Sequence, residues 1–142
     1  MLVRQLKILA FAIIISLFVI FGAGIFVSGN NINPELHYLN LITLIGCSFF
    51  CVASLFIRRS MMKKITLENF FTKYFSTQVI SYALCEFGGI FCLTTNLFVN
   101  QNILFASAGF GITALYVYLN FPKERDFGDF KGVKNVTAKN AK

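Results

Sequence analysis

The stretch ILAFAIIISLFVIFGAGIFV, residues 8–27, contains no charged side chain. An α-helix needs about 20 apolar residues to cross a hydrocarbon core about 30 Å thick, because each residue advances the helix by about 1.5 Å. This stretch is therefore long enough to span a membrane. A second uncharged stretch of the same length, YLNLITLIGCSFFCVASLFI, occupies residues 38–57.

Two further apolar segments follow, over about 79–99 and 103–121, and the first contains one acid, Glu86. The whole chain is 56% hydrophobic and 13% charged, which is too apolar for an ordinary soluble domain. The sequence predicts an all-α integral membrane protein with four transmembrane helices arranged as two hairpins. We expect one transmembrane domain over residues 1–122.

The first segment has one alternative interpretation, a secretory signal, because Arg4 and Lys7 precede its apolar run. A signal core is about 7–15 residues long and ends near a small-residue A-x-A site. The run here is longer, and FGAGIF at 21–26 does not fit that cleavage pattern. We therefore expect a retained helix.

The positions of Lys and Arg predict the orientation. These residues fall before the first segment, between the second and third, and after the fourth, while residues 28–37 and 100–102 contain none. Under the positive-inside rule, both termini and the middle connection are cytoplasmic. A bacterial inner membrane is the simplest location. The net charge of +7 is thus a topology signal, and no nucleic-acid-binding motif accompanies it.

Two segments lie outside the apolar helices. The stretch TLENFFTKYF, residues 66–75, places its aromatic side chains on one face of an amphipathic helix. We favour a helix in the headgroup region, and the alternative is an extension of the third transmembrane helix that packs on a partner. Residues 123–142 are polar and lysine-containing, which predicts a mobile cytoplasmic tail.

Glu86 is the first candidate functional residue, because an intramembrane charge costs at least a few kcal/mol. No Lys, Arg or His lies at a comparable depth, so the carboxyl must be neutral, hydrogen-bonded or hydrated. Two roles remain open for this carboxyl. In the first, it binds a proton or cation, or meets a partner subunit. In the second, it donates one structural hydrogen bond. A proton route normally shows several polar groups, and only one is evident here. Candidate partners are the hydroxyls of Ser16, Ser48, Thr113 and Tyr116.

Small residues mark candidate helix-packing positions. Gly88 and Gly89 lie beside Glu86, Ser107 and Gly111 form one small-xxx-small pair, and Gly24 and Ser28 form another. Such residues let membrane helices approach closely, either within a bundle or against a partner.

The sequence predicts no redox centre, metal site or cofactor. The four cysteines form no C-x-x-C motif, so we expect Cys47, Cys51, Cys85 and Cys92 to be buried free thiols that pack as small hydrophobic groups. His37 is the one histidine, and no other metal ligands cluster around it.

The third and fourth segments, with ALCEFGG at 83–89, resemble the proteolipid rotor subunits of ion-driven ATPases. In that family a helical carboxylate carries the ion, which implies an ion-binding role for Glu86. The resemblance covers less than half of the chain. The glycine-repeat helix of those subunits is missing, because the first segment offers only Gly22 and Gly24. We treat the resemblance as one of chemistry and not of family membership.

Two functions follow from these observations. The first is a small non-catalytic membrane protein that acts as an accessory subunit, assembly factor or stabiliser of a larger membrane complex. The alternative is a small oligomeric proton- or ion-coupled carrier that uses Glu86. An enzyme is not expected, because no nucleophile with a base and no paired carboxylates occur. The expected partners are the lipid bilayer, other membrane subunits or further copies of the chain.

Overall fold

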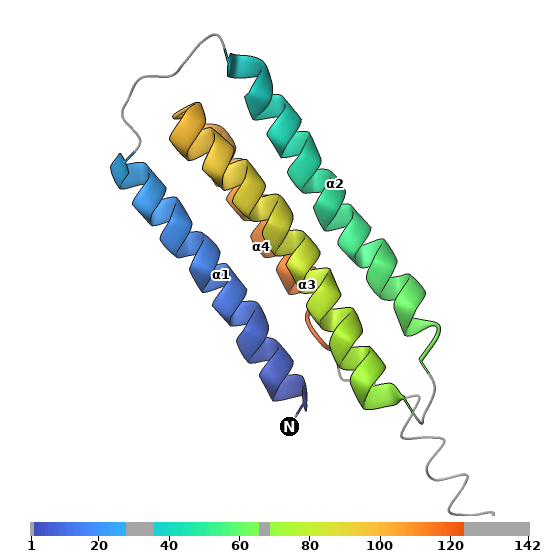
Figure 1. Ribbon diagram of the computed structural model, residues 1–142. Helices are drawn as coiled ribbons and strands as arrows, with labels where there is room; N and C mark the ends of the chain where they lie inside the picture. The colour runs from blue at the N-terminus through green and yellow to red at the C-terminus, as the bar shows by residue number, and fades with distance from the viewer. Residues whose placement is uncertain (1, 28–35, 66–68, 124–142) are drawn as a thin grey trace, which may run out of the picture.

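The computed structural model describes residues 2–27, 36–65 and 69–123. This part of the chain is all-helical and contains no strand, which confirms the all-α part of the prediction. The elements are α1 (Leu2–Val27), α2 (His37–Met62), α3 (Phe70–Thr94), the π-helical η2 (Thr95–Val99) and α4 (Ile103–Leu119). Figure 1 shows them as one elongated four-helix bundle.

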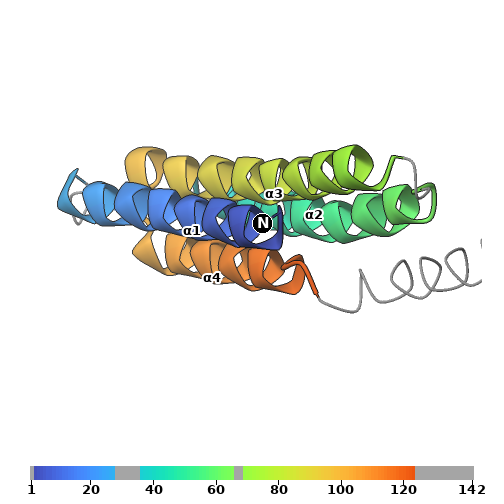
Figure 2. The ribbon, with the colours of Figure 1, turned by 90° about the horizontal axis from the view of Figure 1, so that it is seen from below.

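Consecutive helices run in opposite directions, so the N-terminal end of α1, the end of α2, the start of α3 and the end of α4 lie at one end of the bundle (Figure 1). Figure 1 shows α1 and α2 along opposite edges of the bundle with α3 and α4 between them, and Figure 2 shows α3 and α4 on opposite sides of α1 and α2. Accordingly α1 contacts α3 and α4 but makes no contact with α2. Helices α1 and α2 are therefore consecutive in the sequence and run antiparallel, but they do not pack against each other.

Three of the helices are long and apolar enough to cross a membrane, namely Arg4–Val27, His37–Met62 and Phe70–Val99. The fourth helix has 17 residues and a length of about 25 Å at 1.5 Å per residue. This is slightly less than the hydrocarbon thickness of about 30 Å. The chain is thus a candidate membrane protein with three such spans, and a crossing by α4 stays a prediction.

The helices extend beyond the apolar segments, because α2 ends at Met62 and α3 begins at Phe70. The described part of the amphipathic stretch therefore forms the first turns of α3. Phe70 and Tyr74 are buried and pack with Leu6 of α1 and Ile65. This matches the alternative in which the stretch extends the third helix. Residues 66–68, Ser28 and the tail from 124 lie outside the described residues.

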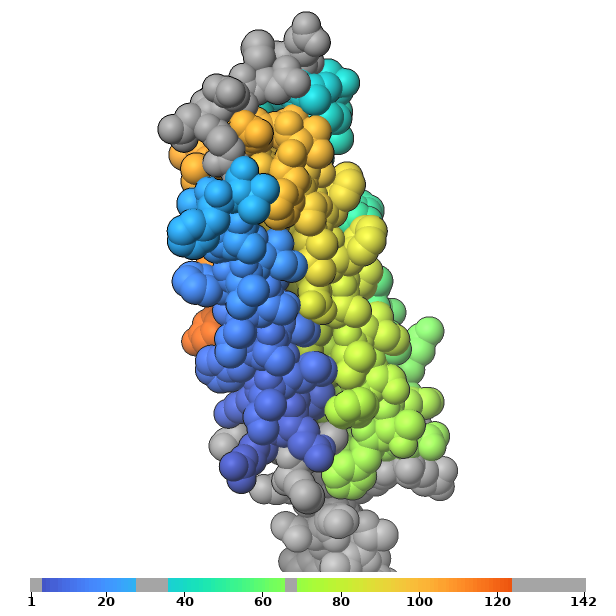
Figure 3. Space-filling view, turned by 60° about the vertical axis from the view of Figure 1, so that its left-hand side comes forward, coloured from blue at the N-terminus to red at the C-terminus, as the bar shows by residue number. Residues whose placement is uncertain are grey.

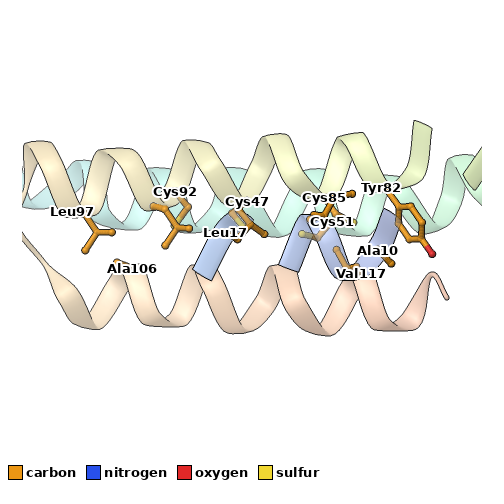
Figure 4. Packing of buried hydrophobic residues seen from close by; sticks show 12 residues of the cluster. Ala10, Leu17, Cys47, Cys51, Tyr82, Cys85, Cys92, Leu97, Ala106 and Val117 are labelled. Atoms are coloured by element: carbon orange, nitrogen blue, oxygen red, sulfur yellow. The ribbon is translucent and has the colours of Figure 1, made fainter. Parts of the chain in front are cut away.

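Apart from Tyr82, the core is built from small and medium-sized side chains contributed by every helix, as Figure 4 shows. Large side chains such as Phe18, Phe49 and Phe56 instead point outward and are more than half exposed. In a membrane this distribution is expected, because lipid solvates apolar side chains and close approach drives helix packing. The buried core residues are Ala10, Ile13, Leu17, Cys47, Cys51, Tyr82, Cys85, Cys92, Leu93, Leu97, Ala106 and Val117.

Candidate functional site

Glu86 lies near the middle of α3 and is half-buried where α3 packs against α1. The Ser16 hydroxyl of α1 donates a hydrogen bond to Oε1 of Glu86 at 3.3 Å. This is longer than the 2.5–3.0 Å typical of O–H···O hydrogen bonds. The same hydroxyl is also 2.9 Å from the carbonyl oxygen of Ile13, and it has only one proton to donate. Ser16 is therefore a weak partner for the carboxyl.

The other predicted partners make no hydrogen bond to Glu86 in the described structure. Ser48 donates to the carbonyl oxygen of Leu44 at 2.9 Å, within its own helix. The Thr113 hydroxyl donates to the Gly109 carbonyl oxygen at 2.9 Å and lies 3.3 Å from Sγ of Cys47. Tyr116 is half-buried, and no hydrogen bond joins it to Glu86 within the described residues. Of the four hydroxyls, the structure brings only that of Ser16 to the acid.

Small exposed side chains lie beside the Ser16–Glu86 contact, because Ala12 is one turn from Ser16 and Ala83 is one turn from Glu86. Figure 3 shows α1 and α3 side by side along this surface. We refer to Ala12, Ser16, Ala83 and Glu86 as the α1–α3 seam. It combines one polar carboxyl with small side chains at mid-helix, facing the position that lipid or another membrane helix occupies.

Buried polar side chains form a first cluster near η2, which the sequence analysis missed. Asn100 donates to Oδ1 of Asn40 at 2.6 Å, and Asn96 donates to Oγ1 of Thr43 at 2.9 Å. Asn40 also lies 3.1 Å from Nδ1 of His37. This distal polar cluster joins α2 to η2 and the residue that follows it, and its asparagines are almost completely buried.

A second cluster lies at the opposite end of the bundle. Arg58 of α2 donates through Nε to Oε1 of Gln78 at 3.0 Å. Gln78 in turn donates to the carbonyl oxygen of Asn120. The Asn120 side chain donates to Oγ of Ser54 at 2.9 Å. This basic-end polar cluster connects α2, α3 and the end of α4.

These clusters correct the expectation that the apolar segments offer only one polar group. The sequence signal that could have identified these buried polar residues is helical periodicity. One face of α3 and η2 carries polar side chains at Gln78, Ser81, Asn96 and Asn100. The same face carries buried Cys85, Gly88, Gly89 and Cys92. Within the described residues, no hydrogen bond connects Glu86 to either cluster. The two clusters join helices to one another and are separate from the seam in the described structure.

The predicted small residues occupy two different environments. A Cβ at Gly89 would lie 2.8 Å from Thr113, and one at Gly88 would lie 3.1 Å from Cβ of Phe50. A Cβ at Gly24 would overlap Leu97. Ser107 and Gly111 instead point outward on α4. The close-approach residue of α4 is Gly109, where a Cβ would overlap Sγ of Cys92.

Gly109 was not singled out from the sequence. The available signal is its position on the buried stripe of α4, between Ala106 and Thr113 at spacings of three and four.

The four cysteines are free and buried in the centre of the bundle. Figure 4 shows their side chains between α2 and α3 along the bundle axis. The Cys47 thiol lies 3.3 Å from the Thr113 hydroxyl, and the Cys85 thiol lies 3.1 Å from the Ser54 hydroxyl. No group of three or more His, Cys, Asp or Glu residues suited to a metal ion occurs in the described ranges.

Comparisons with protein-family models, with curated proteins and with solved structures find no match. The α1–α3 seam is therefore interpreted from its own residues.

Proposed function

We propose that this chain is a small, non-catalytic membrane protein that associates with another membrane protein through the α1–α3 seam. It would act as an accessory subunit, assembly factor or stabiliser of a larger complex. The observation that carries the proposal is the weak pairing of Glu86, a mid-helix carboxyl whose hydrogen bond from Ser16 is 3.3 Å long.

A carboxyl at this depth requires more than one long hydrogen bond, because polar groups in hydrocarbon are costly when poorly paired. A partner helix with a hydroxyl, amide or basic side chain at the same depth would supply the missing interaction. Ala12 and Ala83 support this arrangement, since small exposed residues permit close backbone approach. The partner is thus a second membrane-spanning polypeptide with a hydrogen-bond donor near mid-membrane.

The proposed orientation places both termini in the cytoplasm of a bacterial cell. Its support is the concentration of basic residues at one end of the bundle, which includes Arg4, Arg58, Lys73 and Lys123 (Figure 1). Under the positive-inside rule this end faces the cytoplasm. In that orientation the distal polar cluster lies toward the outer surface.

A second candidate function is proton- or ion-coupled transport through Glu86 in an oligomer. The mid-helix position of the carboxyl favours it, because intramembrane acids commonly mark ion and proton pathways. Glu86→Gln separates the two functions, since glutamine keeps a hydrogen-bonding group but does not titrate. An accessory protein should tolerate this change, whereas a carrier should lose coupled flux.

The test is extraction of the tagged full chain from its native membrane in mild detergent, followed by native mass measurement. We expect a stoichiometric foreign partner that is retained with Glu86→Gln and lost with Glu86→Leu. Ala83→Leu should also remove it by filling the seam, whereas Ala108→Leu, at an exposed position on α4, should not. A homo-oligomer, together with proton flux in liposomes that Glu86→Gln abolishes, would contradict the proposal.

A further inference from the structure

A cavity of about 220 Å³ opens between the ends of α2 and α4, at the basic end of the bundle. Three of its lining residues are cationic, namely Arg58, Arg59 and Lys123. The other two are apolar, Leu55 and Leu119. Among the described residues, its lining thus combines three cationic side chains with an apolar wall, and none of these five residues is acidic.

One of the cations is held in place by the basic-end polar cluster. Arg58 uses Nε to donate to Gln78, whose side chain is fully buried. Gln78 also donates to the carbonyl oxygen of Asn120, which lies three residues before Lys123. A single buried amide therefore positions both the guanidinium group of Arg58 and the chain segment that leads to Lys123. Such preorganisation lowers the cost of binding a ligand at the cavity.

The cavity also lies at a suitable depth for a lipid headgroup. Leu55 and Leu119 belong to the apolar segments, and the cations directly follow those segments in sequence. Arg and Lys at such positions lie at the level of the headgroups. The cationic side chains of this cavity lie toward the ends of the helices, and its apolar side chains lie toward the interior of the bilayer.

We propose that this cavity binds the phosphate group of an anionic membrane lipid. Arginine suits this ligand, because the planar guanidinium matches phosphate oxygens in a fork geometry, and lysine contributes a compact charge. Leu55 and Leu119 would contact the glycerol and the first acyl carbons. Basic pockets between transmembrane helices on the cytoplasmic side are the kind of site that binds anionic headgroups. The site is independent of Glu86 and of the partner proposed above.

The test is native mass spectrometry of the full chain in mild detergent, titrated with phosphatidylglycerol or phosphatidylcholine of identical acyl chains. We expect preferential binding of phosphatidylglycerol. A charged hydrogen bond to a phosphate oxygen contributes roughly ten-fold in affinity or more. The double variant Arg59→Gln/Lys123→Gln should therefore weaken phosphatidylglycerol binding by at least about ten-fold. Both residues lie at the surface end of the bundle, so the fold should survive.

The matched control is Lys63→Gln/Lys64→Gln, which removes the same charge from two exposed residues at the same end that do not line the cavity. It should leave the preference unchanged. An equal loss in the control would overturn the proposal, because the attraction would then be general. Equal affinity for the two lipids would also overturn it. Competition by deacylated glycerophosphoglycerol at the lipid's own concentration would overturn the lipid assignment and indicate a soluble phosphate ligand.

Discussion

The hydroxyl of Ser16 on α1 donates a 3.3 Å hydrogen bond to the carboxyl of Glu86 on α3. This contact joins two helices that are far apart in the sequence at the middle of their lengths. Because Ser16 also lies 2.9 Å from a backbone oxygen of its own helix, it satisfies the carboxyl only in part. The proposed role of the seam depends on that incomplete pairing.

Replacing Ser16 with Ala should lower the free energy of unfolding by less than about 1 kcal/mol, because a long shared hydrogen bond contributes little. Ser48→Ala is the matched control, since that hydroxyl bonds only within α2 in the described structure. Thermal unfolding in mild detergent, followed by circular dichroism, measures both. A loss of several kcal/mol for Ser16→Ala alone would mean that the bundle itself depends on the Glu86 contact.

Gly89→Ala should destabilise the bundle by about 1–3 kcal/mol, because the added methyl group overpacks a tight helix contact. Its Cβ would lie 2.8 Å from both Oγ1 and Cγ2 of Thr113. Gly111→Ala adds the same methyl group where nothing lies within 4 Å, so it should be neutral or slightly stabilising. The measurement is the detergent unfolding midpoint of each variant. Equal effects would contradict the packing of α3 against α4.

Tyr74→Ala should destabilise the protein by about 3–5 kcal/mol, the range for losing a buried aromatic side chain. Tyr74 is fully buried against the N-terminal part of α1, whereas its neighbour Phe71 is 71% exposed. Phe71→Ala should therefore cost less than about 1 kcal/mol. Denaturant unfolding of the two variants tests whether this stretch continues α3. The reverse order of effects would instead favour a separate helix whose aromatic face lies in the headgroup region.

The distal polar cluster should show measurable coupling between Asn40 and Asn100. Their hydrogen bond is 2.6 Å long and buried between α2 and the residue that follows η2. A double-mutant cycle with Asn40→Ala and Asn100→Ala should give about 0.6 kcal/mol, and at most about 1.7, as in other membrane helices. Zero coupling would show that the two amides do not depend on each other.

The four cysteines should resist a water-soluble maleimide in the folded protein and react in denaturing detergent, since all four thiols are buried. Intact mass would report the number of adducts in each condition. Rapid labelling of Cys47 or Cys92 before unfolding would contradict their burial in the core.

The helices could be predicted from the sequence because an apolar run of about 20 residues has few alternative backbone structures, either in water or in lipid. Glu86 could be identified for the same reason, since a lone acid in such a run is conspicuous. The pairing of α1 with α3 could not be predicted. It depends on which faces approach most closely, and contacts such as Gly24 with Leu97 join residues remote in sequence.

The polar interior could not be predicted either, because a single asparagine in or beside an apolar run does not show which helix it will face. Asn96 and Asn100 are in fact buried partners of α2. The burial of these asparagines agrees with the helical periodicity of α3. Once Cys85, Gly88 and Cys92 are known to face inward, the same periodicity places the asparagines on the inward face.

Site-specific photo-crosslinking in the native membrane tests the central claim most directly. A photoreactive residue placed at Ala83 in the α1–α3 seam should capture one foreign membrane polypeptide. The same residue at Ala108, exposed on α4, should not capture it. Capture from Ala108 but not from Ala83, or capture only of lipid or of a second copy from Ala83, would contradict the seam as the docking surface for a partner protein.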